Sequence, residues 1–258
     1  MRFRHVALAA ALAATLASPL AAAPSEASRR RLMTEEQIAQ ARLVVPRDAL
    51  ERRLRSQRRL EAEGVPINPL LPAIEGESEA RRRSVEEVAE RAIALLVVAG
   101  RATGLSRAAA DTIIADLGIA GALSPIERKF IADEAPSEQQ AMQLSWRYEA
   151  AVPLLWALGF IDRLEKPEEP RDTGPLVRLI AGKSRAELLA AARLRPLPQI
   201  LDEADLIFRY HWAAREAELN EQPVPARLDI DVIMERHTAL NWLIGYMDQP
   251  WDEVTTDT

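Results

Sequence analysis

Five capping boxes recur along this chain, and they constrain its fold more than any other feature of the sequence. In a capping box a Ser or Thr side chain accepts a hydrogen bond from the backbone three residues later, where a Glu or Gln bonds back to the first residue. The pairs are Thr34 with Gln37, Ser84 with Glu87, Ser124 with Glu127, Ser137 with Gln140, and Ser184 with Glu187. Each pair marks the start of a helix, so the sequence predicts one helix after another.

The apolar residues between these signals repeat every three or four positions, as they do in helices that bury one face. One such stripe runs from Val85 to Ala99, and another runs from Leu201 to Leu219. No segment shows the sustained alternation and β-branched residues typical of strands. We therefore predict an all-α fold, a single-domain multi-helix bundle over residues 64–258.

Prolines interrupt the helical pattern at two places. Residues 65–72 contain three prolines and should form an extended connector that leads into the domain. Pro153 falls inside a predicted helix from Glu138 to Leu158. Because proline has no backbone N–H, it should kink that helix.

The N-terminus has the three parts of a secretory signal peptide. Arg2 and Arg4 precede an apolar run from Val6 to Ala17, and small residues follow it. We expect a signal peptide over residues 1–27, with cleavage between residues 23 and 27. The apolar run is shorter than the roughly 20 residues that span a membrane. The chain is therefore expected to be exported, to the periplasm, with no permanent transmembrane helix.

Residues 28–63 form a basic segment, with ten arginines against six acidic residues and no aromatic side chain. We interpret this segment as a charged helical arm. It either packs loosely on the domain or contacts a membrane surface or an envelope protein, as basic amphipathic helices do. The whole chain has a formal net charge of −6, which gives no reason to expect a nucleic-acid partner.

The sequence lacks the familiar motifs of catalysis and cofactor binding. It contains no cysteine, which excludes disulfides, a thiol nucleophile and cysteine-ligated metals. No G-x-S-x-G elbow, H-E-x-x-H helix or glycine-rich phosphate loop is present. We predict no cofactor and no metal, and we interpret His211 and His237 as neutral histidines that hydrogen bond to a carboxylate or a carbonyl.

Eleven of the twelve aromatic residues lie at or after Phe130, and paired charges lie beside them. The candidate polar residues are Arg147, Glu149, Glu203, Asp205, Arg209, His211, Arg215, Glu235, His237 and Asn241. The tryptophans expected to line them are Trp146, Trp212, Trp242 and Trp251. Since arginine pairs with carboxylates and stacks on indoles, these residues predict either a buried ion-pair network or the wall of an anion-binding cleft.

Two functions follow from this cluster. The favoured one is a non-catalytic binding or interaction protein. The alternative is a cell-envelope hydrolase with His211, Glu203 or Asp205 as its general base. The hydrolase requires these groups to open onto a pocket, whereas a structural network requires them to be sealed by tryptophans. Trp251 should pin the C-terminal segment to the domain, unless that segment is a lid over the cleft.

Short segments of the chain resemble, in order, a bacterial family called domain of unknown function 4272. They are GVPIN at 64–68, RSVEEV at 83–88, LSP at 123–125, PSE at 136–138, SWR at 145–147, LWALG at 155–159, LRP at 194–196, YHWA at 210–213, ERH at 235–237, ALNW at 239–242 and the terminal segment 251–258. The resemblance covers about residues 58–258 and implies one mainly helical domain. It implies no activity, and the N-terminal leader departs from most of the family.

Overall fold

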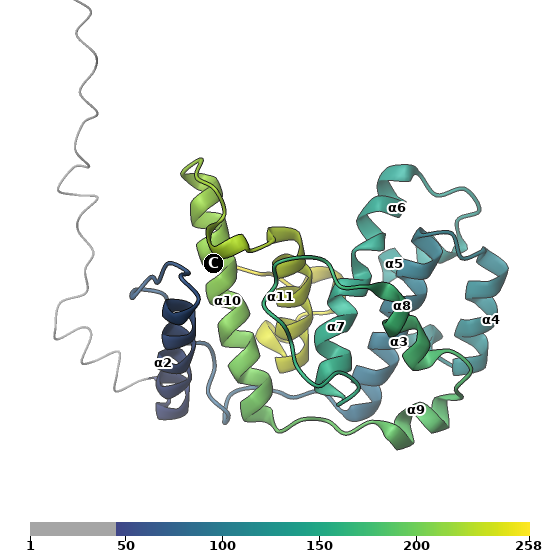
Figure 1. Cartoon of the computed structure of the whole chain (residues 1–258). Coiled ribbons are helices and arrows are strands. Elements are labelled where there is room, and N and C mark those ends of the chain that lie inside the picture. Colours follow the sequence, from purple (N-terminus) through teal and green to yellow (C-terminus); the bar gives the residue numbers. More distant parts are fainter. Residues whose placement is uncertain (1–44) are drawn as a thin grey trace, which may run out of the picture. The chain divides into compact units, whose positions relative to one another are not determined.

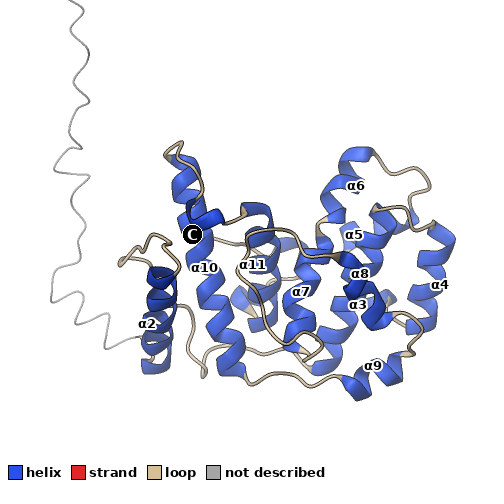
Figure 2. Cartoon of the chain, viewed as in Figure 1, coloured by secondary structure: helices blue, strands red, loops and turns tan. Residues whose placement is uncertain are grey.

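The computed structural model describes residues 45–258, and every secondary-structure element in that part of the chain is helical (Figure 1 and Figure 2). The α-helices are α2 (Arg47–Ala62), α3 (Val85–Ala102), α4 (Arg107–Leu117), α5 (Pro125–Ala132), α6 (Glu138–Ser145), α7 (Arg147–Ala157), α8 (Thr173–Ile180), α9 (Arg185–Ala191), α10 (Leu197–Leu219) and α11 (Ile230–Ile244). Short 3₁₀ helices are η1 (Ala120–Ala122), η2 (Pro225–Arg227), η3 (Tyr246–Asp248) and η4 (Trp251–Glu253). The predicted all-α class is confirmed.

Part of the sequence-based prediction falls on residues that the structure does not describe. The signal peptide at 1–27, the first part of the basic segment at 28–44 and the Thr34 capping box lie outside the described residues. From residue 45 onward, no helix combines the length and the apolar character needed to cross a bilayer.

Four of the predicted capping boxes are present with both hydrogen bonds. They start α3 at Ser84, α5 at Ser124, α6 at Ser137 and α9 at Ser184. In each, the serine side chain accepts from the backbone three residues later, and the Glu or Gln there accepts from the serine's own backbone. Local sequence therefore determines where these helices begin.

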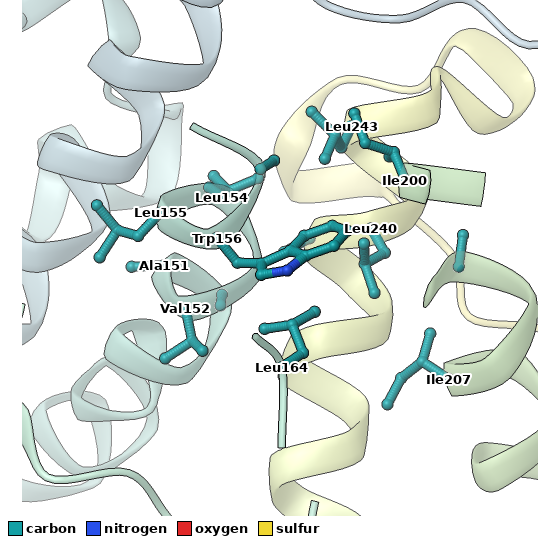
Figure 3. Packing of buried hydrophobic residues seen from close by; sticks show 14 of the residues in the cluster. Ala151, Val152, Leu154, Leu155, Trp156, Leu164, Ile200, Ile207, Leu240 and Leu243 are labelled. Carbon is teal, nitrogen blue, oxygen red and sulfur yellow. The ribbon is translucent and has the colours of Figure 1, made fainter. Parts of the chain in front are cut away.

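The core is formed by a series of packed helices in which α3 contacts α7, α7 contacts α11, and α11 contacts α10. Figure 3 shows the central part of this packing, where Trp156 of α7 lies among Leu164, Leu240 of α11 and Ile207 of α10. A second apolar cluster lies on the other side of α3, where Val97 packs with residues of α4 and α5. Helix α3 is therefore buried on two sides, which accounts for its nearly continuous apolar sequence.

Helix α2 belongs to the same compact unit as the rest of the described chain and packs against α10 (Figure 1). Arg52, in the middle of α2, is buried. Its guanidinium donates to Asp48 at 3.0 Å and to the carbonyl of Glu75 at 2.9 Å, and it lies 3.6 Å from Asp202 of α10. Two of these partners, Glu75 and Asp202, lie outside α2, so this part of the basic segment is fixed to the domain and does not pack loosely.

The predicted helix from Glu138 to Leu158 is in fact two helices, and the interruption is at Trp146, not at Pro153. The backbone N–H of Glu149 donates to the carbonyl of Trp146 at 2.9 Å, which is a tight turn of the 3₁₀ type. Pro153 lies within α7. A groove lies beside Trp146 and Arg147, where the two helices meet.

Candidate functional site: a groove between α5, α7 and α11

An open groove of about 490 Å³ lies between α5, α6, α7 and α11. We call it the α5–α11 groove. Its lining comes from α5 and the residue after it, from α6 and the start of α7, and from the first half of α11. The residues are Ile126, Lys129, Phe130, Asp133, Gln140, Gln143, Leu144, Trp146, Arg147, Asp231, Met234 and Glu235.

Arg147 and Glu235 form an ion pair in this groove. Arg147 Nη1 donates to Glu235 Oε2 at 3.1 Å, and the two side chains are 20% and 18% exposed. Burial raises the pKa of Glu235, and the positive charge of Arg147 opposes that shift. The sequence placed both residues among the candidates, and the structure brings them together although α7 and α11 are far apart along the chain.

A buried ion pair between Arg91 and Glu127 lies next to Arg147. Glu127 of α5 accepts from the guanidinium of Arg91, which is on α3, and Arg147 Nε lies 4.0 Å from the same carboxylate. Burial lowers the pKa of Arg91, and the neighbouring charge of Glu127 opposes this. Glu127 also caps α5 with its other oxygen, which accepts from the backbone of Ser124 at 2.9 Å. The sequence revealed the cap and gave no sign of the ion pair.

His211 and His237 contact each other in the interior. Their Nδ1 atoms lie 3.0 Å apart and their rings meet edge to face, so one ring donates and the other accepts. Both are buried, at 4% and 2% exposure. Burial lowers the pKa of His211 to about 4 and that of His237 to about 3. The partner of each histidine is therefore the other histidine, not the expected carboxylate or carbonyl.

Two other candidate acids are sealed in ion pairs. Glu149 contacts Arg236 at 2.9 Å and also accepts from the backbone of Arg171. Asp205 is bound by both Nε and Nη2 of Arg209, at 2.8 and 2.7 Å. All four side chains in these pairs are buried. Glu149 and Asp205 are thus held in two separate buried ion pairs, and neither residue lines the α5–α11 groove.

Glu203 lies in a different place, between α2 and α10. Burial raises its pKa, while Arg59, at 3.8 Å, acts in the opposite direction. The cavity that it lines is only about 20 Å³, enough for about one water molecule. None of the three general bases considered from the sequence, His211, Glu203 and Asp205, lines the α5–α11 groove.

The remaining tryptophans have separate roles. Trp251 packs edge to face on Trp242 with ring centres 5.7 Å apart, and the guanidinium of Arg91 lies 4.2 Å from the centre of the Trp251 ring. Asn241 donates to the carbonyl of Thr255 at 2.8 Å. The C-terminal segment is thus held against the domain by Trp251 and Asn241.

Two candidates are at the edge of the fold. Trp212 is half-buried at the margin of the main core. Arg215, one turn beyond His211, is exposed and pairs with Glu218 at 2.7 Å. Neither residue lines the α5–α11 groove. Across residues 45–258, no three His, Asp or Glu side chains are grouped so that they could hold a metal ion.

Sequence reasoning did not single out Lys129, Asp231 or Met234, which line the groove. Asp231 precedes Glu235 by four residues, and this spacing places both on one face of α11. That spacing was the only feature of the sequence that could have indicated Asp231 as a residue of the groove. Lys129 and Met234 carry no motif and are recognised only from the packing of α5 against its neighbours.

Comparison with known protein families places the chain in one of them. It belongs to the family described as domain of unknown function (DUF4272), whose model matches residues 52–254. The resemblance seen in the sequence is therefore confirmed, and the match begins inside α2. Searches of the curated proteins and of the solved structures give no match.

Proposed function

We propose that this protein is an exported, non-catalytic binding module that holds a polypeptide segment in the α5–α11 groove. The observation that carries the proposal is the Arg147–Glu235 pair, which is accessible in this groove of about 490 Å³, whereas Glu149, Asp205 and His211 are buried. A concave, largely pre-formed site with a few polar groups is the usual form of a binding site.

The apolar part of the groove suits a partner's hydrophobic side chain. Phe130 and Leu144 are buried beneath it, and Ile126 and Met234 at its margin are 53% and 45% exposed. Large apolar side chains that stay exposed beside a concave surface are typical of interaction sites. Methionine also adapts to different partners because its side chain is flexible and polarisable.

The polar part of the groove favours a peptide over a simple anion. Gln140 and Gln143 each offer both donors and acceptors, as a peptide backbone requires. Arg147, the residue best suited to an anion, is already paired with Glu235. Lys129 and Asp133 add one charge of each sign, so the groove has no excess of positive charge to attract an anion.

Selection of a random peptide library on the mature protein tests this function. Selected peptides should lose at least about tenfold in affinity for Met234→Glu, since a charge there opposes burial of an apolar anchor. Met247→Glu is the matched control, because Met247 is 67% exposed and does not line the groove. Peptides that bind both variants equally well, or a library that yields no binder, would contradict the proposal.

The proposed compartment is the periplasm, and its support is the basic, apolar and small-residue order of residues 1–27. Fractionation of cells that express the full chain, with mass measurement of the intact product, tests it. The expected product is periplasmic and begins between residues 24 and 28. A full-length chain in the cytoplasm would contradict export.

We also propose a contact with an envelope protein or a membrane surface through residues 28–63. Arg47, Arg55 and Arg58 of α2 are exposed, although Arg55 pairs with Asp202 at 2.6 Å. Vesicles containing anionic lipid should bind the mature protein and release it at high salt. Vesicles that bind equally well a chain that lacks residues 28–46 and also carries Arg47→Gln and Arg58→Gln would show that the segment is not the contact.

A hydrolase is the alternative function, and one observation favours it. Burial raises the pKa of Glu235 beside the open groove, and exposed Asp231 lies on the same face of α11. Two carboxyl groups in unlike environments suit a general acid and a general base. Turnover of model esters or glycosides that is lost in Glu235→Gln and kept in Asp116→Asn, a remote surface change, would support the hydrolase over the binding module.

A further inference from the structure

A second cavity, of about 340 Å³, lies between the first half of α3, the turn that leads into α5, the end of α11 and η4. We call it the α3–η4 cavity, and it shares no lining residue with the α5–α11 groove. We propose that this cavity binds a neutral, hydroxyl-rich ring compound, the chemical class of a pyranose sugar. Three buried polar atoms without partners, the paired charges of the lining and its two indole rings support this proposal.

Two of the unpaired atoms are buried donors. Trp251 is 6% exposed and Arg91 is 3% exposed. Within residues 45–258, no acceptor bonds to the indole Nε1 of Trp251 or to the Nε of Arg91. The other nitrogens of Arg91 are occupied, since Nη1 donates to the carbonyl of Ala122 at 2.5 Å and Nη2 donates to Glu127. A buried donor without an acceptor is costly, so each would gain from a ligand that accepts a hydrogen bond.

Asp252 supplies a buried acceptor beside the same cavity. Its Oδ2 accepts from the backbone of Ile126, at the start of α5, at 3.0 Å. Its Oδ1 is buried and has no donor in the described part of the chain. Because Arg91, Trp251 and Asp252 all line the cavity, a ligand seated there can supply the missing partners with only small side-chain rotations. Such a ligand must both accept and donate hydrogen bonds.

The charges around the cavity favour a neutral ligand. Two lining carboxylates already have cationic partners, since Glu87 lies 3.8 Å from Arg83 and Glu90 lies 2.5 Å from Arg185. An anionic ligand would be repelled by these carboxylates. A cationic ligand could donate to the unpaired acceptor, but it would leave both buried donors without a partner.

The apolar part of the lining suits a ring. Trp242 and Trp251 meet edge to face with ring centres 5.7 Å apart, and Leu123, Pro125 and Pro250 extend this apolar surface. The C–H groups of a sugar ring can pack on such a surface. Its hydroxyls each donate and accept, so they can reach the unpaired atoms of both kinds. The volume of the cavity falls within the range of about 300–1,000 Å³ that is usual for small-molecule sites.

Nuclear magnetic resonance titration of the isotope-labelled mature protein with the methyl glycosides of glucose, galactose and mannose tests the proposal. The indole N–H resonance of Trp251 is identified as the one missing from Trp251→Phe. It should move downfield with at least one glycoside, because a new hydrogen bond deshields the proton. The indole N–H of Trp146, which lines the α5–α11 groove, should not move. No change at Trp251 with any of the three glycosides would overturn the proposal.

Two further probes test the chemical class of the ligand. Tetrahydropyran-2-methanol keeps the ring and lacks the ring hydroxyls, whereas glucuronate keeps the hydroxyls and adds a carboxylate. Each should bind at least about tenfold more weakly than the best glycoside. Equal affinity for tetrahydropyran-2-methanol would reject recognition through hydroxyls, and equal affinity for glucuronate would reject the preference for a neutral ligand.

Matched variants locate the site. Asp252→Asn keeps an oxygen for the backbone of Ile126 and replaces the unpaired acceptor by an amide donor. Asp252→Asn and Trp251→Phe, which removes the indole donor, should each weaken binding of the best glycoside by about tenfold. Asp116→Asn makes the same change as Asp252→Asn on the exposed face of α4 and should leave the affinity unchanged. Affinity that is equal in all three variants would place the glycoside elsewhere and reject this cavity as its site.

Discussion

Mild acid should destabilise this protein through the buried His211–His237 pair. In the unfolded chain both histidines titrate near their usual value of 6.5, whereas in the folded chain their pKa values are about 4 and about 3. Between these limits the unfolded chain binds two protons that the folded chain does not bind. Stability is therefore complete above pH 6.5 and is lost progressively as the pH falls towards 4.

The size of the effect follows from the number of protons. Each proton changes the unfolding free energy by about 1.4 kcal/mol per pH unit, so the pair contributes about 2.7 kcal/mol per unit. From pH 7.0 to 5.5 the expected loss is about 2.5 kcal/mol. Because pH 5.5 lies above both folded-state pKa values, this loss depends little on their exact size.

Other buried groups change the stability in the opposite direction as the pH falls. Burial raises the pKa of Glu203 and of Glu235, so the folded chain protonates these carboxyls first and gains stability as the pH falls. The effect of the histidines must therefore be measured as a difference between matched variants. The double variant His211→Asn/His237→Asn suits this purpose, because Asn places a polar atom near Nδ1 and does not titrate.

Urea unfolding followed by far-ultraviolet circular dichroism, at pH 7.0 and at pH 5.5, provides the measurement. The wild type should lose about 2.5 kcal/mol more than the double variant between the two conditions. The smaller Asn side chains lower the unfolding free energy of the variant equally at both pH values. The change in unfolding free energy between pH 7.0 and pH 5.5 is therefore unaffected by the loss of packing. If the double variant does not fold, His211→Asn alone should remove about half of the pH effect. An equal loss in wild type and variant would refute the reasoning.

Removal of α2 should abolish cooperative thermal unfolding, since Arg52 and Leu60 are buried against the domain; an unchanged melting curve would contradict that packing. Arg91→Ala should cost about 3–5 kcal/mol in urea unfolding, because it leaves the buried carboxylate of Glu127 without its partner; a cost below about 1 kcal/mol would show that Glu127 is solvated. Trp251→Ala should cost about 3 kcal/mol, and Trp251→Phe much less, if the ring pins the C-terminal segment; equal costs would argue against ring packing.

The helix starts were predictable because a capping box is a local signal. Ser84 and Ser124 cap their helices with residues three positions away, and no distant contact is needed to form that motif. The position of α2 was not predictable in the same way. Its arginines suggested a solvated helix, but Arg52 finds its partners in Asp202 and in the carbonyl of Glu75, both far along the sequence.

The candidate site was only partly predictable for a related reason. Residues that are close in sequence were grouped together, but burial can change within one turn of a helix. His211 contacts His237 of α11, while Arg215, one turn later on the same side of α10, is exposed. Arg147 and Glu235 meet only because α7 packs against α11. The composition indicated that ion pairs would form, and the packing of the helices decides which of them is accessible.

The binding role of the α5–α11 groove is the central claim, and nuclear magnetic resonance mapping of a selected peptide on the isotope-labelled mature protein tests it most directly. We predict that the largest backbone shift changes fall on α5, on the junction at Trp146 and on the first half of α11, and that they disappear in Met234→Glu. Shift changes confined to other helices, or unaltered in Met234→Glu, would contradict the account.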